Sequence, residues 1–274
     1  MHTEKIVLET ISDLVPIKKF SNSLCAEKKV ARVLFLSSTQ HPFIEELAKG
    51  LAILNVETFI VYSSFANLKP LLRSPSFIIN VIYFTIRIII GNPRLMVKLT
   101  GITLRHVFFS PKRLLTLTYY LVIASLVYAL NSRYKFDLIH SFWSYPAGIS
   151  AVLARTVLRK PVVISVLGYD LEGKRTTRIG FFREISKLAL EEAEAVIVAA
   201  EYHLSLLERM KIKSRNYFIP IGIDTNKFNP NVPGRYVREK YNVPESDVVV
   251  AFGPRLTELY NPEDFLEAAL IVSR

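Results

Sequence analysis

Apolar runs with the character of buried strands alternate with helical patterns along most of this chain, and this alternation limits the possible folds more than any other feature. Ala31–Ser37 (ARVLFLS) is rich in apolar and β-branched residues, as expected of a parallel strand covered on both faces. A helical spacing of apolar residues follows over Phe43–Leu54, and a second strand pattern covers Glu57–Tyr62. Strands that alternate with helices form right-handed crossovers. The sequence therefore predicts an α/β fold, a Rossmann-like open parallel sheet with helices on both faces.

The alternation resumes after residue 136. Further strands are predicted at Asp137–Ser141, Val162–Leu167, Ala195–Ala199 and Asn216–Ile219, with helices at Ala147–Leu158, Phe181–Ala193 and Tyr202–Met210. In an open parallel sheet, ligands bind in the crevice at the carboxyl ends of the strands. The residues that directly follow each strand are therefore the candidate site.

Turn-forming residues concentrate in Ile219–Asn229 (IPIGIDTNKFN), as is typical of a hinge. Beyond it, the apolar run Val248–Phe252 predicts a new strand, and a helix is predicted from Pro262. We expect a leader at 1–29, a first domain at 30–218 with a basic, apolar, helical insertion at 66–130, a hinge at 219–247, and the truncated start of a second domain at 248–274.

The net charge of +11 is concentrated in one stretch of the chain. Thr58 to Phe136 contains no Asp or Glu and ten Lys or Arg residues, so the rest of the chain carries a net charge of only +1. The same stretch holds two apolar runs, Phe77–Ile90 and Leu114–Leu130. Apolar side chains beside cations suit the surface of an anionic bilayer. We expect this membrane surface to include Arg105, Lys112 and Arg113.

Other interpretations of this stretch stay open. Leu114–Leu130 is also compatible with a buried helix flanked by surface charges. As a membrane span it lies at the short edge of the roughly 17–25 residues required, and it is rich in Thr and Tyr. Nucleic acid fits less well, because grooves that follow phosphates need solvated polar faces.

The sequence disfavours cofactor and metal chemistry. The loop after the first strand, SSTQHPFIEE, has no glycine, so the dinucleotide fingerprint of NAD or FAD enzymes is absent. The five histidines are scattered, and the single cysteine, Cys25, has no partner at metal-ligand spacing. We expect no cofactor and no metal. A lone thiol is typical of a reducing compartment, so we expect a cytoplasmic protein peripheral to the inner face of the cell membrane.

Five segments, in this order, carry a family resemblance: FDLIHSFWSYPAGISAVLAR (136–155), KPVVISVLGYD (160–170), EAEAVIVAAE (192–201), IPIGIDTNKFNP (219–230) and FGPRLTELYNPEDFLEA (252–268). Together they resemble family-4-like retaining glycosyltransferases of the GT-B fold, over about residues 30–274. The resemblance implies an N-terminal acceptor domain and a C-terminal domain that binds a nucleotide-sugar donor as substrate. It further implies retention of the anomeric configuration without a bound metal.

The resemblance also implies roles for particular residues. His140 and Asp170 match catalytic positions, and Arg255 with Gly253 matches the donor site, where a guanidinium can bind diphosphate oxygens in pairs. The acceptor crevice would be lined by His41, Trp143, Tyr145 and Gly168. Structural roles stay open: a packed His140, an Asp170 that caps a turn, and an Arg255 paired at the surface.

Two residues depart from the family pattern. Phe142 stands where many members have a second histidine, and Leu167 stands where the common H-G-x-D has its histidine.

The expected function is transfer of a hexose from a nucleotide-sugar to a lipid-linked or glycan acceptor, with this chain as the acceptor half and a separate chain as a source of the donor domain. One alternative is a non-catalytic, membrane-associated sugar- or lipid-binding domain. The other is an unrelated α/β protein such as a reductase.

Overall fold

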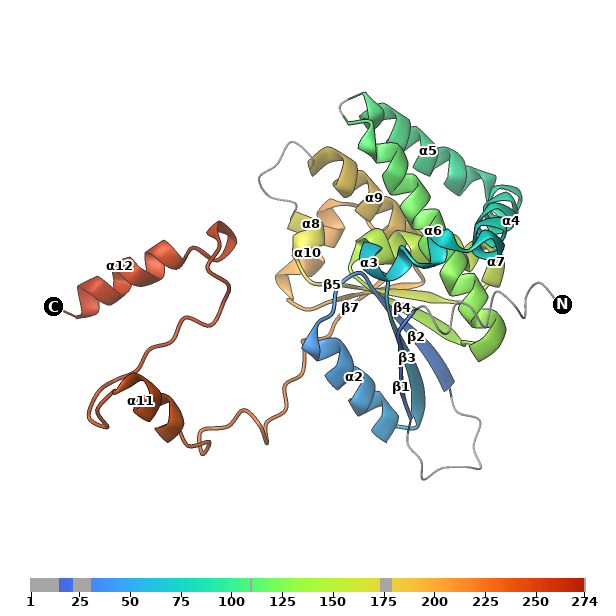
Figure 1. Ribbon diagram of the computed structural model, residues 1–274. Coiled ribbons are helices and arrows are strands. Elements are labelled where there is room, and N and C mark those ends of the chain that lie inside the picture. Colours follow the sequence, from blue (N-terminus) through green and yellow to red (C-terminus); the bar gives the residue numbers. More distant parts are fainter. Residues whose placement is uncertain (1–14, 22–30, 109, 173–178, 274) are drawn as a thin grey trace. The chain divides into compact units, whose positions relative to one another are not determined.

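The computed structural model describes residues 15–21, 31–108, 110–172 and 179–273 (Figure 1). The chain divides into two compact units, Met1–Gly222 and Ile223–Arg274.

The first unit is built on a seven-stranded sheet with the order β1-β3-β2-β4-β5-β6-β7. The strands are β1 (Ile17–Phe20), β2 (Ala31–Ser37), β3 (Val56–Tyr62), β4 (Leu138–Phe142), β5 (Val162–Val166), β6 (Ala195–Val198) and β7 (Arg215–Phe218). All neighbouring strands run parallel except β1, which pairs antiparallel with β3. The predicted α/β class with an open, mostly parallel sheet is confirmed.

Helices cover both faces of this sheet (Figure 1). Successive side chains of a strand point to opposite faces. Accordingly, Val33 and Phe35 of β2 pack in a cluster with helix α2 (Pro42–Ile53), whereas Leu34 and Leu36 pack in the larger cluster on the other face. This is why the central strands are apolar along their whole length rather than alternating. The larger face is covered by α4 (Pro75–Gly91), α5 (Pro93–Val107), α6 (Lys112–Tyr134), α7 (Ile149–Leu158) and α9 (Ile179–Glu192).

Residues 1–29 were expected to form a leader outside the fold, but four of them form β1. Ile17 lies opposite Val61 of β3, and Lys19 forms an ion pair of 2.5 Å with Glu57. Lys18 likewise binds Glu45 of α2 at 2.7 Å. The strand was missed because its sequence, IKKF, is short and carries two charges. Lysines are common on edge strands, where they discourage pairing with other chains.

The predicted insertion is helical, and its helices begin at clear caps. The Ser74 hydroxyl accepts the N–H of Phe77 at the start of α4, and the Asn92 side chain accepts the N–H of Leu95 at the start of α5. A proline follows each cap residue directly. Proline is favoured at this first helical position because its missing N–H has no partner there in any case. Shorter elements precede α4: α3 (Phe65–Leu68) and the 3-10 turn η1 (Leu71–Arg73).

The run Leu114–Leu130 lies in α6, and most of its second half belongs to the core. Tyr120, Leu126 and Leu130 are all buried, and α6 packs against α4, α5 and α7. Among the described residues, α6 is the one single helix long and apolar enough to cross a membrane, with half of its apolar window buried. Segment 65–73 and α4 meet the same test only as a pair bent by 105°. The buried-helix interpretation of Leu114–Leu130 therefore agrees with its packing.

The second unit contains α11 (Arg235–Tyr241), the 3-10 turn η3 (Glu258–Tyr260) and α12 (Pro262–Val272). The strand predicted at Val248–Phe252 is not formed. Val248 and Val250 are exposed to 89% and 71%, and no strand in the described part of this unit lies alongside to accept their hydrogen bonds. A backbone run of strand character needs such a neighbour, which explains the difference from the prediction.

Candidate functional site

The carboxyl ends of β4 and β5 form the centre of the candidate site. Trp143, Ser144 and Tyr145 follow β4, and Gly168 and Asp170 follow β5. The two strands are parallel neighbours, with Phe142 opposite Ser165, so both loops lie on the same edge of the sheet. We call this edge the rim.

Trp143 has an unusual backbone conformation, with φ +67° and ψ 144°. Its N–H donates to the carbonyl of Ser165 at 2.8 Å, and its own carbonyl accepts the N–H of Gly148 at 3.1 Å. A Cβ atom at position 148 would lie 2.9 Å from that carbonyl oxygen, so only glycine fits there without a shift. Non-glycine residues with such angles persist only where the surroundings fix them, and they cluster at functional sites.

Asp170 joins the two rim loops. One carboxylate oxygen accepts the N–H of Ser144 at 2.8 Å, and the other accepts the N–H of Leu167 at 3.3 Å. The Ser144 hydroxyl continues the network by donating to Ser186 of α9 at 2.7 Å. Burial raises the pKa of Asp170, while the hydrogen bonds from Ser144 oppose that rise. The buried carboxylate is thus placed to fix the shape of the rim.

His140 lies below the rim, within the sheet. Its Nε2 is 2.7 Å from the Ser165 hydroxyl, and its ring stacks on Phe142 with the centroids 4.7 Å apart. The ring of Phe35 packs against the His140 ring in a T-shaped arrangement, with the centroids 5.2 Å apart. Burial lowers the pKa of His140 to about 4, so the imidazole is neutral at physiological pH. These contacts are those of a packed, hydrogen-bonded histidine.

Gly168 has φ +110°, in the region that favours glycine. A Cβ atom here would also lie 3.1 Å from the ring of His203, which belongs to α10 (Tyr202–Arg209). His203 is 5% exposed. The sequence did not single out His203, nor Ser144, Ser165 and Ser186, because isolated serines and a helical histidine carry no pattern.

Two of the predicted acceptor residues lie along one aromatic row. The ring of Phe43 is 4.6 Å from His41 and 6.4 Å from Trp143, so it stands between them. His41 is exposed, and Trp143 is partly buried. Tyr145 is engaged elsewhere, stacked on Phe182 of α9 with the centroids 4.7 Å apart.

The remaining predicted residues lie away from the rim or in the other unit. Arg255 and Gly253 belong to the second unit, so their positions bear only on that unit, where both are exposed. Arg105 is exposed and forms an ion pair of 2.6 Å with Glu184. Lys112 is exposed at the start of α6. Arg113 differs from its neighbour, because its guanidinium lies 4.4 Å from the ring centroid of Phe181.

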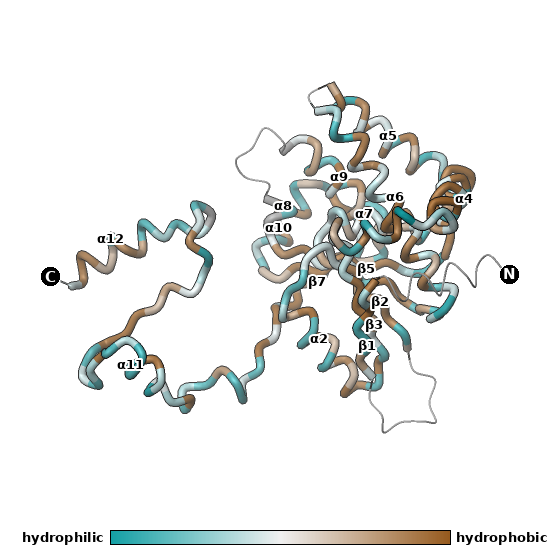
Figure 2. The backbone as a smooth tube through the Cα atoms, viewed as in Figure 1, coloured by the Kyte–Doolittle hydropathy of each residue, from teal (hydrophilic) through white to brown (hydrophobic). Residues whose placement is uncertain are grey.

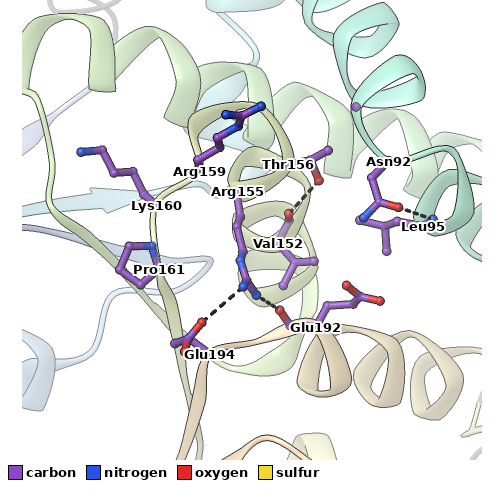
Figure 3. A pocket seen from close by; sticks show the side chains of 11 residues that line it. Asn92, Leu95, Val152, Arg155, Thr156, Arg159, Lys160, Pro161, Glu192 and Glu194 are labelled. Carbon is purple, nitrogen blue, oxygen red and sulfur yellow. Dashed lines mark hydrogen bonds and ion pairs between the residues drawn. The ribbon is translucent and has the colours of Figure 1, made fainter.

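A pocket of about 510 Å³ lies at the opposite, amino-terminal edge of the sheet (Figure 3). Pro161 and Glu194, which immediately precede β5 and β6, line it, together with Arg155 of α7. Arg155 binds the Glu194 carboxylate at 3.2 Å and the Glu192 carbonyl. Its charge is therefore neutralised within the protein. Across the described ranges, no three His, Cys, Asp or Glu side chains gather as a metal site would require.

The chain is similar to proteins that are already known. Residues 40–222, more than half of the chain, match the model of the glycosyl transferase 4-like domain. No curated protein matches the chain. Among solved structures, the chain is similar to sucrose-phosphate synthase from Thermosynechococcus elongatus, with 13% identity, a TM-score of 0.49, and coverage of 79% of this chain and 53% of that one. The chain thus spans about half the length of that protein.

Proposed function

The chain belongs to the glycosyl transferase 4-like family, and on this premise we propose that its first unit holds the acceptor for sugar transfer from a nucleotide-sugar. The acceptor would lie on the rim, over His41, Trp143 and Gly168. The observation that carries the proposal is the Trp143 turn. An aromatic residue in an unfavourable conformation, fixed through Ser165 and Gly148, indicates a side chain held ready for a ligand.

An aromatic rim suits a sugar. Indole and phenyl faces bind the apolar faces of sugar rings, and the row from His41 through Phe43 to Trp143 offers such faces beside one another. In this proposal Asp170 is a positioning residue, because both of its carboxylate oxygens accept backbone N–H groups. His140 supports the rim through Ser165, with its ring packed against Phe35 and Phe142.

The donor side of the reaction belongs to the second unit. Arg255 would bind the diphosphate of the nucleotide-sugar and stabilise the negative charge of the leaving group. A hexose donor, retention of configuration and a partner chain that carries a donor domain complete the proposal.

The acid-free stretch 58–136 supports a location at a membrane. We place the chain at the inner face of the cell membrane, with a lipid-linked or glycan acceptor. Lys112 is exposed, as contact with lipid phosphates requires, whereas Arg105 is exposed but paired with Glu184.

Transfer of labelled sugar tests the proposal. The chain, mixed with candidate donor-domain chains, is incubated with a panel of labelled nucleotide-sugars and a membrane lipid extract, and transfer is measured. We expect transfer that depends on both chains and falls at least about tenfold in Trp143→Ala. The matched control is Tyr217→Ala, which removes a half-exposed aromatic side chain on the edge strand β7. Absence of transfer with every candidate partner would contradict the proposal.

A second function is favoured by one observation. Phe142 and Leu167 replace histidines of the family pattern, and the remaining His140 is enclosed. A non-catalytic, membrane-associated sugar- or lipid-binding domain needs neither histidine. Binding of the extracted acceptor to the rim without any transfer would select this alternative, and Trp143→Ala would weaken that binding.

A further inference from the structure

Helix α4 has two apolar faces, of which the fold covers one. Phe77, Phe84 and Ile88 form a stripe that is fully buried against the core. A second stripe with helical spacing remains exposed, between 46% and 76% for each residue: Ile79, Ile82, Tyr83, Ile86, Ile89 and Ile90. Figure 2 shows α4 as an almost continuous hydrophobic helix at the periphery of its unit. We call the exposed residues the isoleucine stripe.

Such a stripe is not a normal surface of a protein in water. Single exposed apolar residues are common, but contiguous apolar patches mark a contact surface. A helix that is apolar all round belongs either in a protein core or against lipid. Since the buried stripe already satisfies the core, the isoleucine stripe needs an external partner.

Charge identifies the chemistry of that partner. No Asp or Glu occurs between residues 58 and 136, so α4, α5 and α6 contribute no negative charge. Arg87 lies at the border of the stripe, with its Nη1 donating to the Tyr83 hydroxyl at 3.3 Å. Arg94 and Lys98, on the first turns of α5, are exposed. An apolar surface bordered by Arg87, Arg94 and Lys98 complements the apolar layer and anionic headgroups of an anionic bilayer.

We propose that α4 lies flat in the interface of an anionic membrane, with the isoleucine stripe among the acyl chains and Arg87, Arg94 and Lys98 among the lipid phosphates. This inference rests on the membrane location proposed above and identifies the element that makes the contact. The helix does not span the bilayer, because Phe77 and Ile88 keep its other face in the core. At 17 residues it is about 25 Å long and presents several turns to the interface.

Vesicle binding by stripe variants tests the proposal. Sedimentation is measured with vesicles of phosphatidylcholine containing phosphatidylglycerol, and with phosphatidylcholine alone. The triple variant Ile79→Gln, Ile86→Gln, Ile90→Gln is expected to bind the anionic vesicles at least about tenfold more weakly than the unmodified chain. The double variant Ile53→Gln, Leu54→Gln, which alters two comparably exposed residues of α2 and its C-cap, is the matched control and should bind normally. Equal binding by the stripe variant overturns the proposal, as does equal binding of the unmodified chain to both vesicle types.

A second set of variants tests whether the cations of α5 contribute to vesicle binding. Arg94→Gln with Lys98→Gln should weaken binding to the anionic vesicles, and more strongly at low salt than at high salt. Lys213→Gln, an exposed cation between α10 and β7, should have no effect. If neutralising the two α5 cations leaves binding and its salt dependence unchanged, the assignment of an anionic partner is wrong.

A fluorescent probe attached to the isoleucine stripe distinguishes a lipid partner from a protein partner. An environment-sensitive fluorophore is attached to Ile86→Cys in a Cys25→Ser background, with Ile53→Cys as the control position. We expect a blue shift at position 86 on addition of anionic vesicles, quenched by lipids that carry a nitroxide on the acyl chain, and no shift at position 53. A shift without vesicles that grows with protein concentration would assign the stripe to a second copy of the chain and overturn the proposal.

Failure of this inference is distinguishable from failure of the proposed function. The stripe variant should retain sugar transfer to an acceptor soluble in water, because α4 takes no part in the rim. Trp143→Ala should retain vesicle binding and lose transfer. Vesicle binding through α4 in a chain that never transfers sugar would leave the inference intact and refute the enzymatic proposal.

Discussion

The carboxylate of Asp170 accepts the backbone N–H of Ser144 at 2.8 Å, so one buried side chain fixes the loops that follow two neighbouring strands. The contact crosses from the carboxyl end of β5 to that of β4. Because Ser144 directly follows the Trp143 turn, the shape of the rim depends on this buried acidic residue.

Asp170→Asn should destabilise the first unit by about 1–3 kcal/mol. The amide keeps one acceptor oxygen but presents N–H₂ to the second backbone donor, which is then left unpaired in a buried position. Urea unfolding followed by circular dichroism measures the effect. Asp137→Asn is the control: its exposed carboxylate also accepts a backbone N–H, from Arg32, but water can replace it. Equal effects of the two substitutions would contradict the structural role of Asp170.

Stability should fall in mild acid because of His140. Its pKa is about 4 in the folded state and near 6.5 when unfolded, so the unfolded chain binds the proton first. The stability that neutral His140 contributes is complete above pH 6.5 and is lost as the pH falls towards 4. The slope is at most about 1.4 kcal/mol per pH unit.

The contribution of His140 to the pH dependence of stability is obtained by comparing the unmodified chain with a variant that lacks the imidazole. Buried Asp170, whose pKa is raised in the folded state, changes the stability with pH in the opposite direction to His140. The stability that protonated Asp170 contributes is present at low pH and is lost as the pH rises through the raised pKa. Unfolding free energies of the unmodified chain and of His140→Gln are compared at pH 7.5 and 5, and only the unmodified chain should show the loss attributed to His140. A parallel pH dependence of both proteins would show that the ring is accessible to protons in the folded state.

Gly148→Ala should disrupt the Trp143 turn. The added methyl group would lie 2.9 Å from the Trp143 carbonyl oxygen and 3.2 Å from Ile164, so the backbone must shift at a cost of about 1–3 kcal/mol. Gly50→Ala within α2 is the matched control, because no other atom lies within 4 Å of the place that its methyl group would occupy. That change should stabilise by up to about 1 kcal/mol. Thermal unfolding of both variants gives the comparison.

Substitutions of the adjacent residues Arg113 and Lys112 should have different effects, the first on stability and the second on membrane binding. Arg113→Ala removes a guanidinium that lies 4.4 and 4.9 Å from the centroids of Phe181 and Phe182, and should cost about 0.5–2 kcal/mol of stability. Lys112→Ala alters an exposed side chain and should leave the unfolding free energy unchanged while weakening binding to anionic vesicles. Equal stability of the two variants would refute the packing role of Arg113.

The sheet was predictable because its central strands are buried on both faces, which leaves apolar runs such as residues 33–36 of β2 in the sequence. The edge strand β1 lacks that signal, since two of its four residues are lysines whose partners, Glu45 and Glu57, come from other elements. Val248–Phe252 carried the signal without forming a strand, because strand formation also requires a neighbour.

The candidate site was predictable in place but not in detail. Position after a parallel strand located Trp143 and Asp170, whereas the strain at Trp143 and the buried bonds of Asp170 depend on Ser165, Gly148 and Ser144, which no pattern connects. The stretch 58–136, which contains no Asp or Glu, predicted a surface that binds an anionic membrane. Which of its two apolar runs faces outward could not be read from the sequence, because this depends on what packs against α4 and α6.

The pairing of β2 with β4 also constrains the order in which this protein assembles. Arg32 donates its backbone N–H to the Asp137 carboxylate at 3.0 Å across 105 positions, and α4, α5 and α6 lie in the intervening chain. The centre of the sheet therefore cannot close until the ribosome has delivered the isoleucine-rich helix, and closing so long a loop is slow. During synthesis the nascent chain exposes both the open edge of β2 and α4 together. Membrane binding by α4, as proposed above, would at that stage shield the polypeptide from aggregation before its sheet has formed.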